Sequence, residues 1–414
     1  MGLLARLRVH SQDGLVRGSA GVVLAFLLTQ WFGFVFWIIA ARRFDPDAVG
    51  AITAAGSAMT LSALLVTAGI PPLLLRILPV SGNRVKPRVR MVLTWTIAAS
   101  MASGLVIGLL SNAQEPIVLF FIVVGAVFTA LAVVGDAIAT AGRATRLVAV
   151  RGVTASAGKI ALIFVPFPLL GMTFGVSAGL FAWVISMAVS ALYILWASRA
   201  SLAALETLPS HESHQPWRMA AANHVTVIGQ QLPILALPVL AGAIVGDEVA
   251  GLLYVPWLIG TAIYTLPGLV AGVLLAEGAR EAGETSALLH RAVRLLLLTV
   301  VPAAVVAALF APLLLGLFSE EYVVGTPILI LVSLSTIPVC IKALTFSIWR
   351  LNNRTSRCAL LALSSGTAAT LATWMVLVTG APLTLIALAW FAIQGMSALV
   401  ALPTLVGAMR AKRT

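Results

Sequence analysis

The chain has 414 residues, of which 60% are apolar and only 10% are charged, and its mean hydropathy is +1.06. A single water-soluble core cannot bury so large an apolar excess, so much of this surface must face lipid. The net charge of +12 comes from bases that are spread along the chain, with no basic domain and no interleaved aromatic residues. This pattern argues against a nucleic-acid partner.

Uncharged runs predict the membrane spans, because a helix needs about 20 residues to cross roughly 30 Å of hydrocarbon. Most runs fit one crossing each, but the runs 160–198 and 358–409 are too long. Each has glycine and proline near its middle, around Gly171 and Gly380, which predicts a helical hairpin. The first hairpin is slightly short for two helices, so its first arm is expected to begin upstream, near Val150.

The expected fold class is therefore an all-α, polytopic membrane protein of about 12 transmembrane helices. The first span is needed for this count, so the N-terminal run is not interpreted as a cleavable signal peptide. The predicted spans cover residues 19–41, 48–72, 91–111, 116–137, 150–170, 173–196, 219–244, 249–274, 292–316, 323–348, 358–379 and 383–408.

The distribution of Lys and Arg over alternate loops predicts the orientation, because cationic loops stay on the cytoplasmic side of the membrane. If both termini are cytoplasmic, only Arg42 and Arg43 of the 26 Lys and Arg residues fall in exterior segments. A missed or added helix would destroy such a strong bias. The bias therefore supports the number of spans as well as the orientation.

Weak internal similarity predicts two related halves. A shift of 201 residues places Gln30 over Gln231 and also places Gly50 over Gly251. Span one then matches span seven, and two six-helix halves of the same orientation are related by an axis along the membrane normal. Chance agreement is the competing interpretation, because few identities support the shift. The expected domains are an N-terminal six-helix lobe, a cytoplasmic linker and a C-terminal six-helix lobe, at residues 1–205, 206–217 and 218–414.

Several segments carry a spaced pattern that points to a known family. In the first half these are Ala41-Arg42-Arg43-Phe44 before Gly50, and Arg151 followed by Lys159. In the second half they are Asn223-His224 through Pro233 and Pro238 to Gly246, Gly251, Trp257, Ala276-Glu277-Gly278, Leu314-Leu315-Gly316-Leu317-Phe318, Tyr322, Ile337-Pro338 and the segment around Arg354. This pattern resembles the polysaccharide-biosynthesis and oligosaccharide flippases of bacteria, which transport lipid-linked cargo. They belong to the superfamily that also contains the multidrug and toxic compound extrusion transporters.

The resemblance covers nearly the whole chain, as a spaced apolar pattern without a catalytic signature, although the chain is short for the family. It implies two pseudo-symmetric lobes around a central cavity that opens alternately to either side of the bacterial inner, or plasma, membrane. It also implies the cargo, an oligosaccharide on a polyprenyl pyrophosphate carrier. Such proteins flip this cargo to the outer leaflet for the biosynthesis and export of polysaccharide or lipopolysaccharide.

Cations inside the membrane are the first candidate binding residues. The hairpin length places Lys159 within the fifth span, and Lys342 lies within the tenth. Ionisable groups in the membrane are expensive, so these lysines are expected to face water, a partner or the headgroup region. One interpretation is that Lys159 and Arg151, together with Lys342, bind the pyrophosphate group. The other is that the lysines reach the membrane surface along their flexible side chains.

Neutral polar residues are the second group of candidates. Span seven contains Asn223, His224, Gln230 and Gln231, and Gln30 is their counterpart in span one. Amides of this kind either bind sugar hydroxyls or join neighbouring helices. His224 is also a candidate for coupling transport to protons, because histidine titrates near neutral pH. A hydrogen-bonded histidine at a helix end is the simpler interpretation.

Asp136 ends the fourth span and is a candidate gating or coupling residue. It lies about two helical turns before Arg143. The simpler interpretation is a carboxylate that pairs with a neighbouring Arg. The two cysteines, Cys340 and Cys358, give no sign of a disulfide or a metal site, and no cofactor is expected.

Two other function classes compete with a flippase. An enzyme acting on the same lipid-linked sugars would need carboxylates or histidines on a sizeable outer loop, but the predicted outer loops are short, as residues 42–47 illustrate. A drug or small-molecule antiporter coupled to H⁺ or Na⁺ is the closer alternative. It would be expected to carry an acidic residue deep in span one or seven, and neither span contains one. Membrane lipids are expected partners in either case.

Overall fold

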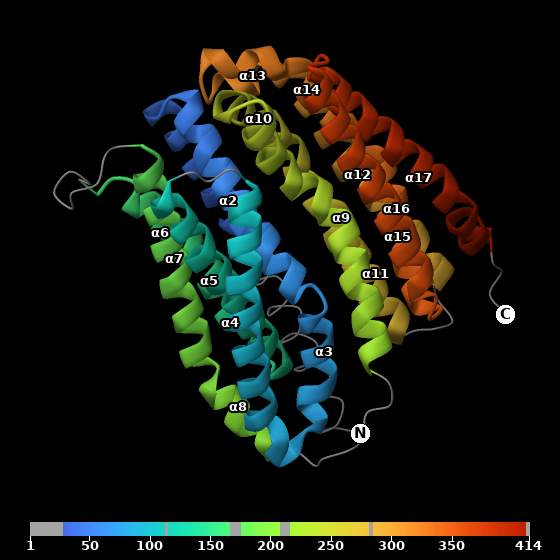
Figure 1. The fold of residues 1–414 in the computed structure, drawn as a ribbon. Helices are drawn as coiled ribbons and strands as arrows, with labels where there is room; N and C mark the ends of the chain where they lie inside the picture. The colour runs from blue at the N-terminus through green and yellow to red at the C-terminus, as the bar shows by residue number, and fades with distance from the viewer. Residues whose placement is uncertain (1–27, 112–114, 166–174, 208–215, 281–284, 411–414) are drawn as a thin grey trace. The chain divides into compact units, whose positions relative to one another are not determined.

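The computed structural model describes residues 28–111, 115–165, 175–207, 216–280 and 285–410. All regular secondary structure in these ranges is helical (Figure 1). The first half contains a helix at residues 28–43, α2 (Pro46–Thr67), α3 (Ile70–Ile77), η1 (Leu78–Val80), η2 (Gly82–Arg84), α4 (Val85–Leu110), α5 (Pro116–Ala141), α6 (Thr145–Leu162), α7 (Val176–Ala197) and α8 (Arg199–Glu206).

The second half consists of long helices, several of which are interrupted near the middle of a predicted span. The span-eight helix is divided into α10 and α11, and the span-ten helix into α14 and α15. The helices are α9 (Pro216–Ile244), α10 (Asp247–Ala262), α11 (Thr265–Arg280), α12 (Thr285–Leu309), α13 (Ala311–Gly316), η4 (Glu320–Gly325), α14 (Thr326–Leu334), α15 (Thr336–Leu351), α16 (Thr355–Thr379) and α17 (Thr384–Arg410).

The all-α, multi-pass fold class is confirmed. Ten helical segments of the described residues are long and apolar enough to cross a membrane. The helix at 28–43 and α6 correspond to the first and fifth predicted spans. The rest of those two spans, at 19–27 and 166–170, lies outside the described residues. Together these twelve segments follow the predicted order, which agrees with about 12 transmembrane helices.

The chain divides into two compact units. The first comprises Met1–Ala40, Ser62–Leu109 and Ala113–Trp217, and the second comprises Ala41–Leu61, Leu110–Asn112 and Arg218–Thr414. The second unit therefore includes the first part of α2. This part of α2 packs against α10 at a close crossing, where a Cβ atom added to Gly50 would lie 1.7 Å from the carbonyl oxygen of Asp247. Only glycine fits at such a backbone approach.

In the first unit, α5, α6 and α7 pack against one another (Figure 1). Small residues allow this close packing, as in other membrane helix bundles. A Cβ atom added to Gly158 on α6 would lie 2.7 Å from the Oγ of Ser186 on α7, and that hydroxyl donates to the carbonyl oxygen of Ala155. The contact fixes α6, which carries Arg151 and Lys159, against α7.

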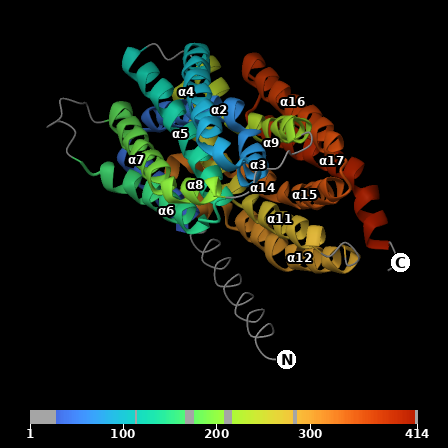
Figure 2. The same ribbon diagram turned by 90° about the horizontal axis from the view of Figure 1, so that it is seen from below.

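In the second unit, α11, α12 and α15 lie side by side, as Figure 2 shows from below. The interruptions of spans eight and ten place Tyr264 and Ser335 between consecutive helices. Pro267 and Pro338 each fall in the first turn of the following helix. A missing backbone N–H is tolerated in a first turn but not in a helix interior, so each proline favours a new helix at its position.

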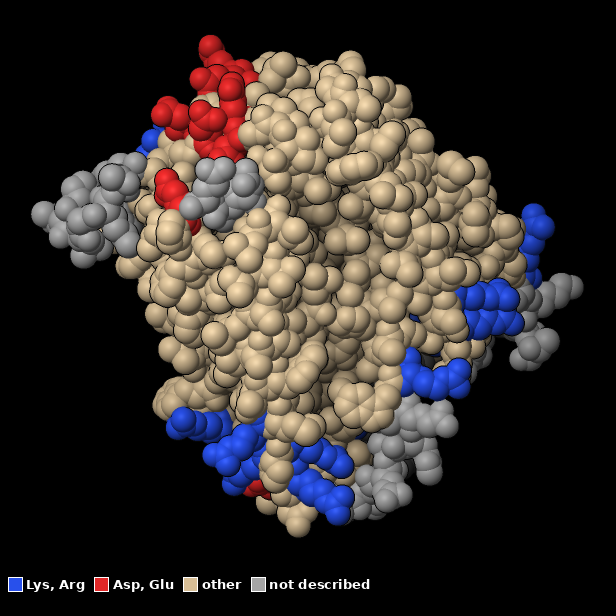
Figure 3. Space-filling model, in the orientation of Figure 1, with Lys and Arg blue, Asp and Glu red and all other residues tan. Residues whose placement is uncertain are grey.

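Several charged residues of the second unit lie at the ends of its helices. Asp247 and Glu248 begin α10, whereas Arg350 lies in the last turn of α15 and Arg410 in the last turn of α17. Acidic and basic side chains likewise gather in separate patches on the face drawn in Figure 3. Between the helix ends the surface is predominantly apolar, as expected for helices that face lipid.

Candidate functional site

A cavity of about 210 Å³ lies within the second unit, among α9, α11, α15, α16 and α17. We call it the Lys342 cavity, because Lys342 of α15 is the one charged residue among its described lining residues. Its polar lining also includes Gln230, Gln231, Ser365 and Gln394. The cavity therefore brings together three of the residues selected from the sequence, namely Lys342 and the two glutamines of α9.

The Lys342 ammonium is held by a neutral partner. Its Nζ donates a hydrogen bond of 2.7 Å to the Oε1 atom of Gln394 on α17, and the lysine side chain is only 6% exposed. This position does not agree with the interpretation that Lys342 reaches the membrane surface. None of the described residues that line the cavity is a carboxylate, so the lining supplies no counter-charge to this cation.

A hydrogen-bond network of Tyr264, Ser335 and Trp390 borders the same cavity. The Nε1 group of Trp390 donates to the Tyr264 hydroxyl at 2.7 Å and to the Ser335 hydroxyl at 3.0 Å. The hydroxyls of Tyr264 and Ser335 also lie within hydrogen-bonding distance of each other and of the carbonyl oxygen of Val332, so their two protons are shared among these contacts. The network thus joins the interruptions of spans eight and ten to α17 and satisfies polar groups that burial would otherwise leave unpaired.

A second close crossing fixes the α9 side of the cavity. A Cβ atom added to Gly229 of α9 would lie 2.4 Å from the carbonyl carbon of Ala362 on α16. The neighbouring residues Gln230 and Ser365 line the cavity. The crossing therefore sets how far α9 and α16 stand apart, and with that the width of the cavity between them.

Lys159 lies in a separate environment in the first unit. Its Nζ atom is 4.7 Å from the ring centroid of Trp183 on α7 and 5.5 Å from that of Phe36 in the helix at 28–43. Aromatic faces attract cations at such distances. The two rings also contact each other edge to face, with their centroids 6.3 Å apart. Lys159 is therefore a partly buried cation held by aromatic rings, and among the described residues it forms no salt bridge.

Asp136 and Arg151 form an ion pair in the first unit. The Nε atom of Arg151 on α6 donates to the Oδ1 atom of Asp136 on α5 at 2.7 Å, and both side chains are mostly buried. The sequence indicated pairing of Asp136 with a neighbouring Arg, and the Arg partner in the structure is Arg151, although Arg143 is nearer along the chain. Arg143 instead occupies a turn after α5 with a positive φ of 59°. Chain reversal between α5 and α6 brings Arg151 back beside Asp136.

The other candidates do not line the Lys342 cavity. Gln30 is exposed in the helix at 28–43, and Asn223 and His224 lie in the first half of α9, before the cavity residues. Gln231 is exposed, although it is one of the lining residues of the cavity. The amides selected from the sequence thus divide into cavity residues and residues elsewhere.

Sequence reasoning missed Gln394, Trp390 and Tyr264. Gln394 could have been found, because it is the only Asn or Gln in the uncharged stretch between Arg357 and Arg410. A lone amide in a membrane helix is expensive without a partner. The roles of Trp390 and Tyr264 depend on contacts between distant parts of the chain, and their sequence neighbours carry no signal of them.

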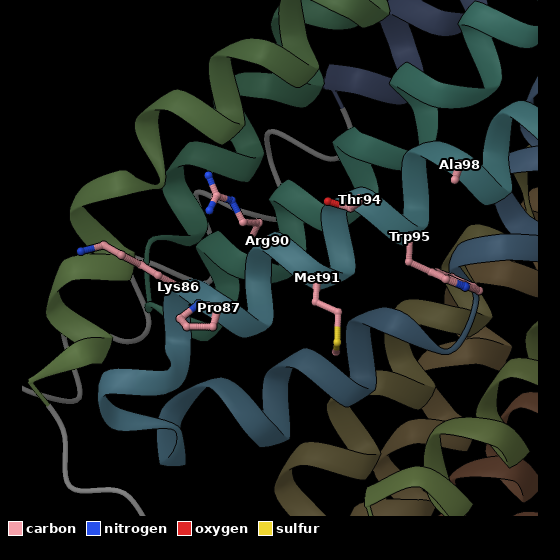
Figure 4. Close-up of a pocket in the computed structure, with 7 residues that line it drawn as sticks. All are labelled: Lys86, Pro87, Arg90, Met91, Thr94, Trp95 and Ala98. Atoms are coloured by element: carbon pink, nitrogen blue, oxygen red, sulfur yellow. The ribbon is translucent and has the colours of Figure 1, made fainter.

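A wider hollow of about 1020 Å³ runs along α4 of the first unit (Figure 4). The residues that line this hollow form a row along α4. Figure 4 shows Lys86 and Arg90 near one end of the row and Trp95 and Ala98 near the other, with Met91 between them. Lys86 also forms an ion pair of 2.8 Å with Glu206. A row that changes from basic to apolar along one helix is the arrangement expected where a helix passes from lipid headgroups to lipid tails.

Comparisons with solved structures identify the fold. An inward-facing multidrug resistance transporter of the MATE family, in the MOP superfamily, matches over 93% of this chain and 96% of its own, with a TM-score of 0.66 and 14% identity. The lipid II flippase MurJ in its inward closed conformation matches over 94% of this chain and 89% of its own, with a TM-score of 0.66 and 11% identity. An outward-facing MATE transporter matches over 96% of both chains, with a TM-score of 0.60 and 14% identity.

No family model and no curated protein matches the chain. The chain therefore has the fold that MATE transporters and the MurJ flippase share, and it is a multi-pass membrane protein. Both kinds of neighbour move a substrate across a membrane. Their identities to this chain are too low to transfer a substrate from either one.

Proposed function

We propose that this protein flips a lipid-linked oligosaccharide, carried on a polyprenyl pyrophosphate, from the cytoplasmic to the outer leaflet by alternating access. The product would serve the synthesis of a cell-surface polysaccharide. The proposal rests on one observation, the sign of the charges inside the membrane helices. Lys159 and Lys342 are cations without a carboxylate partner among the described residues.

The interior charge of the described spans fits an anionic cargo. Away from the helix ends, Asp136 is the one carboxylate in the described spans, and Arg151 neutralises it. A pyrophosphate group would face a prohibitive cost in hydrocarbon without compensating positive charge. Lys159 and Lys342 supply such charge, one in each unit. The basic-to-apolar row along α4 is likewise suited to a cargo that is a lipid.

An antiporter for cationic drugs is the alternative that the MATE neighbours suggest. Such a cargo, and a coupling cation such as Na⁺ or H⁺, would favour unpaired carboxylates inside the membrane. The described spans instead contain two lysines without a carboxylate partner and one aspartate that an arginine neutralises. This difference favours the flippase.

The decisive experiment compares both cargoes in the same proteoliposomes. The lipid probe is a fluorescent polyprenyl pyrophosphate that bears a short oligosaccharide, and its leaflet is read with a membrane-impermeant quencher. The drug probe is a fluorescent organic cation, tested with an imposed Na⁺ or H⁺ gradient. We expect protein-dependent movement of the lipid and none of the dye. Dye transport driven by the gradient, with no lipid movement, would show that the protein is an antiporter.

A further inference from the structure

We propose that the Lys342 cavity binds one acidic sugar residue of the cargo, with the anionic group of that sugar at the Lys342 ammonium. The inference rests on the proposed function and deepens it, because it names the chemical class of the glycan. It concerns the second unit alone and needs no contact between the units.

The charge of the cavity defines the part of the ligand that Lys342 would bind. An ammonium group has three N–H donors, and Gln394 accepts one hydrogen bond from it at 2.7 Å. That amide is neutral, and the described lining contains no carboxylate. A cation that is 94% shielded from solvent is costly without a counter-charge. A carboxylate or phosphate on the ligand would supply that charge and accept the remaining N–H groups.

The volume of the cavity limits the rest of the ligand. About 210 Å³ corresponds to roughly seven water molecules at their liquid volume. This is below the usual range for sites that hold drug-sized molecules. It is comparable with one pyranose ring and its substituents, and too small for a complete oligosaccharide. The cavity is therefore suited to a single sugar residue.

The remaining lining matches the hydroxyl groups and the apolar face of a sugar ring. Gln230 and Gln231 offer both hydrogen-bond donors and acceptors on the α9 side, and the Ser365 hydroxyl, which donates to the Leu361 carbonyl, offers an acceptor on the α16 side. The stacked rings of Trp390 and Tyr264 add aromatic lining, and the Trp390 N–H group is already bonded to Tyr264 and Ser335. The network holds Trp390 in place before a ligand binds, which lowers the entropic cost of binding.

The test measures binding to the purified full-length protein in detergent by thermal unfolding. The probes are sodium glucuronate, sodium glucose 6-phosphate and glucose, all at one ionic strength set with sodium chloride. We expect glucuronate or glucose 6-phosphate to raise the unfolding midpoint by about 2 °C more than glucose does. The more effective anion identifies the group as a carboxylate or a phosphate. Equal shifts for glucose and both anions, or no shift at all, would overturn the proposal.

Two variants show whether the effect comes from this cavity. Lys342→Met should lose the difference between the anions and glucose, whereas Arg294→Met, which removes an exposed charge of α12, should retain it. If Lys342→Met does not fold, the second test compares the tryptophan fluorescence of the wild type with that of Trp390→Phe. Quenching of the wild type by the effective anion should be smaller in Trp390→Phe. An undiminished signal in that variant, or an unchanged shift in Lys342→Met, would place the anion elsewhere.

The outcome is separable from that of the flippase proposal, because these probes are soluble and carry no lipid. Anion binding without lipid flipping would leave the cavity assignment intact and overturn the proposed function. Lipid flipping without anion binding would overturn only the assignment of an acidic sugar to this cavity.

Discussion

A Cβ atom added to Gly366 would lie 1.9 Å from the carbonyl oxygen of Gly229, so α16 and α9 cross backbone to backbone at these two residues. We predict that Gly366→Ala destabilises the protein by about 1–3 kcal/mol, because the added methyl must push the two helices apart. Gly395→Ala is the control, since its Cβ meets nothing within 4 Å, and it should be neutral or slightly stabilising. Thermal unfolding in detergent measures both. Equal stability of the two variants would contradict the crossing.

The ion pair between Asp136 and Arg151 should couple α5 to α6. Both side chains are mostly buried, so removal of one partner leaves the other without its counter-charge. In a double-mutant cycle with Asp136→Asn and Arg151→Met, we predict a coupling free energy of about 2 kcal/mol. Unfolding midpoints of the four proteins measure it. If the two single effects simply add, the pair contributes nothing to stability.

Lys159 is predicted to bind the phosphate groups of the carrier. Lys159→Gln should abolish complementation of a flippase-deficient bacterial strain while the protein inserts at normal levels. Lys159→Arg should retain more activity, because it keeps the charge and the attraction to Trp183, although guanidinium has a different shape.

The matched control for Lys159 is Arg291→Gln, which removes an exposed base of α12 and should complement fully. Immunoblots of membrane fractions establish the amount of each variant. Full complementation by Lys159→Gln would reduce Lys159 to a structural cation that its aromatic neighbours hold in place.

The predicted orientation places both termini in the cytoplasm. Reporter fusions after Arg84, after Ser210 and at Thr414 should therefore report a cytoplasmic location. Fusions after Asp45, Asp247 and Glu320 should report the exterior, because positively charged loops resist export. Activity of paired alkaline phosphatase and fluorescent-protein reporters measures each position. One reversed location would refute the twelve-span topology.

The Trp390 network should stabilise the interruptions of spans eight and ten. Trp390→Phe keeps an aromatic ring but removes the N–H group that donates to Tyr264 and Ser335. We predict a loss of about 1–2 kcal/mol, since neutral hydrogen bonds contribute about 1 kcal/mol each. Trp374→Phe, on the exposed face of α16, is the control and should change stability little. An equal loss in both would indicate that ring size, rather than the network, matters.

The sequence by itself determined the fold class and the order of the spans. So much apolar surface is not stable in water, and the uncharged runs have the length that the bilayer imposes. The spans can therefore be predicted without any knowledge of how the helices pack. The hairpin turn near Gly380 followed from the same local chemistry, and Gly380 does end α16 with a φ of 66°. The length of the uncharged run after Lys159 likewise predicted that this residue lies inside a helix.

Only the tertiary structure decided which polar residues meet. Lys342 and Gln394 are 52 residues apart in the chain, and Asp136 pairs with Arg151 rather than with the nearer Arg143. A helix has many faces, and nothing local in the sequence shows which face turns to a neighbour, to a cavity or to lipid. Those choices follow from the close crossings, such as Gly229 with Gly366, where the packing of whole helices sets the distance between side chains.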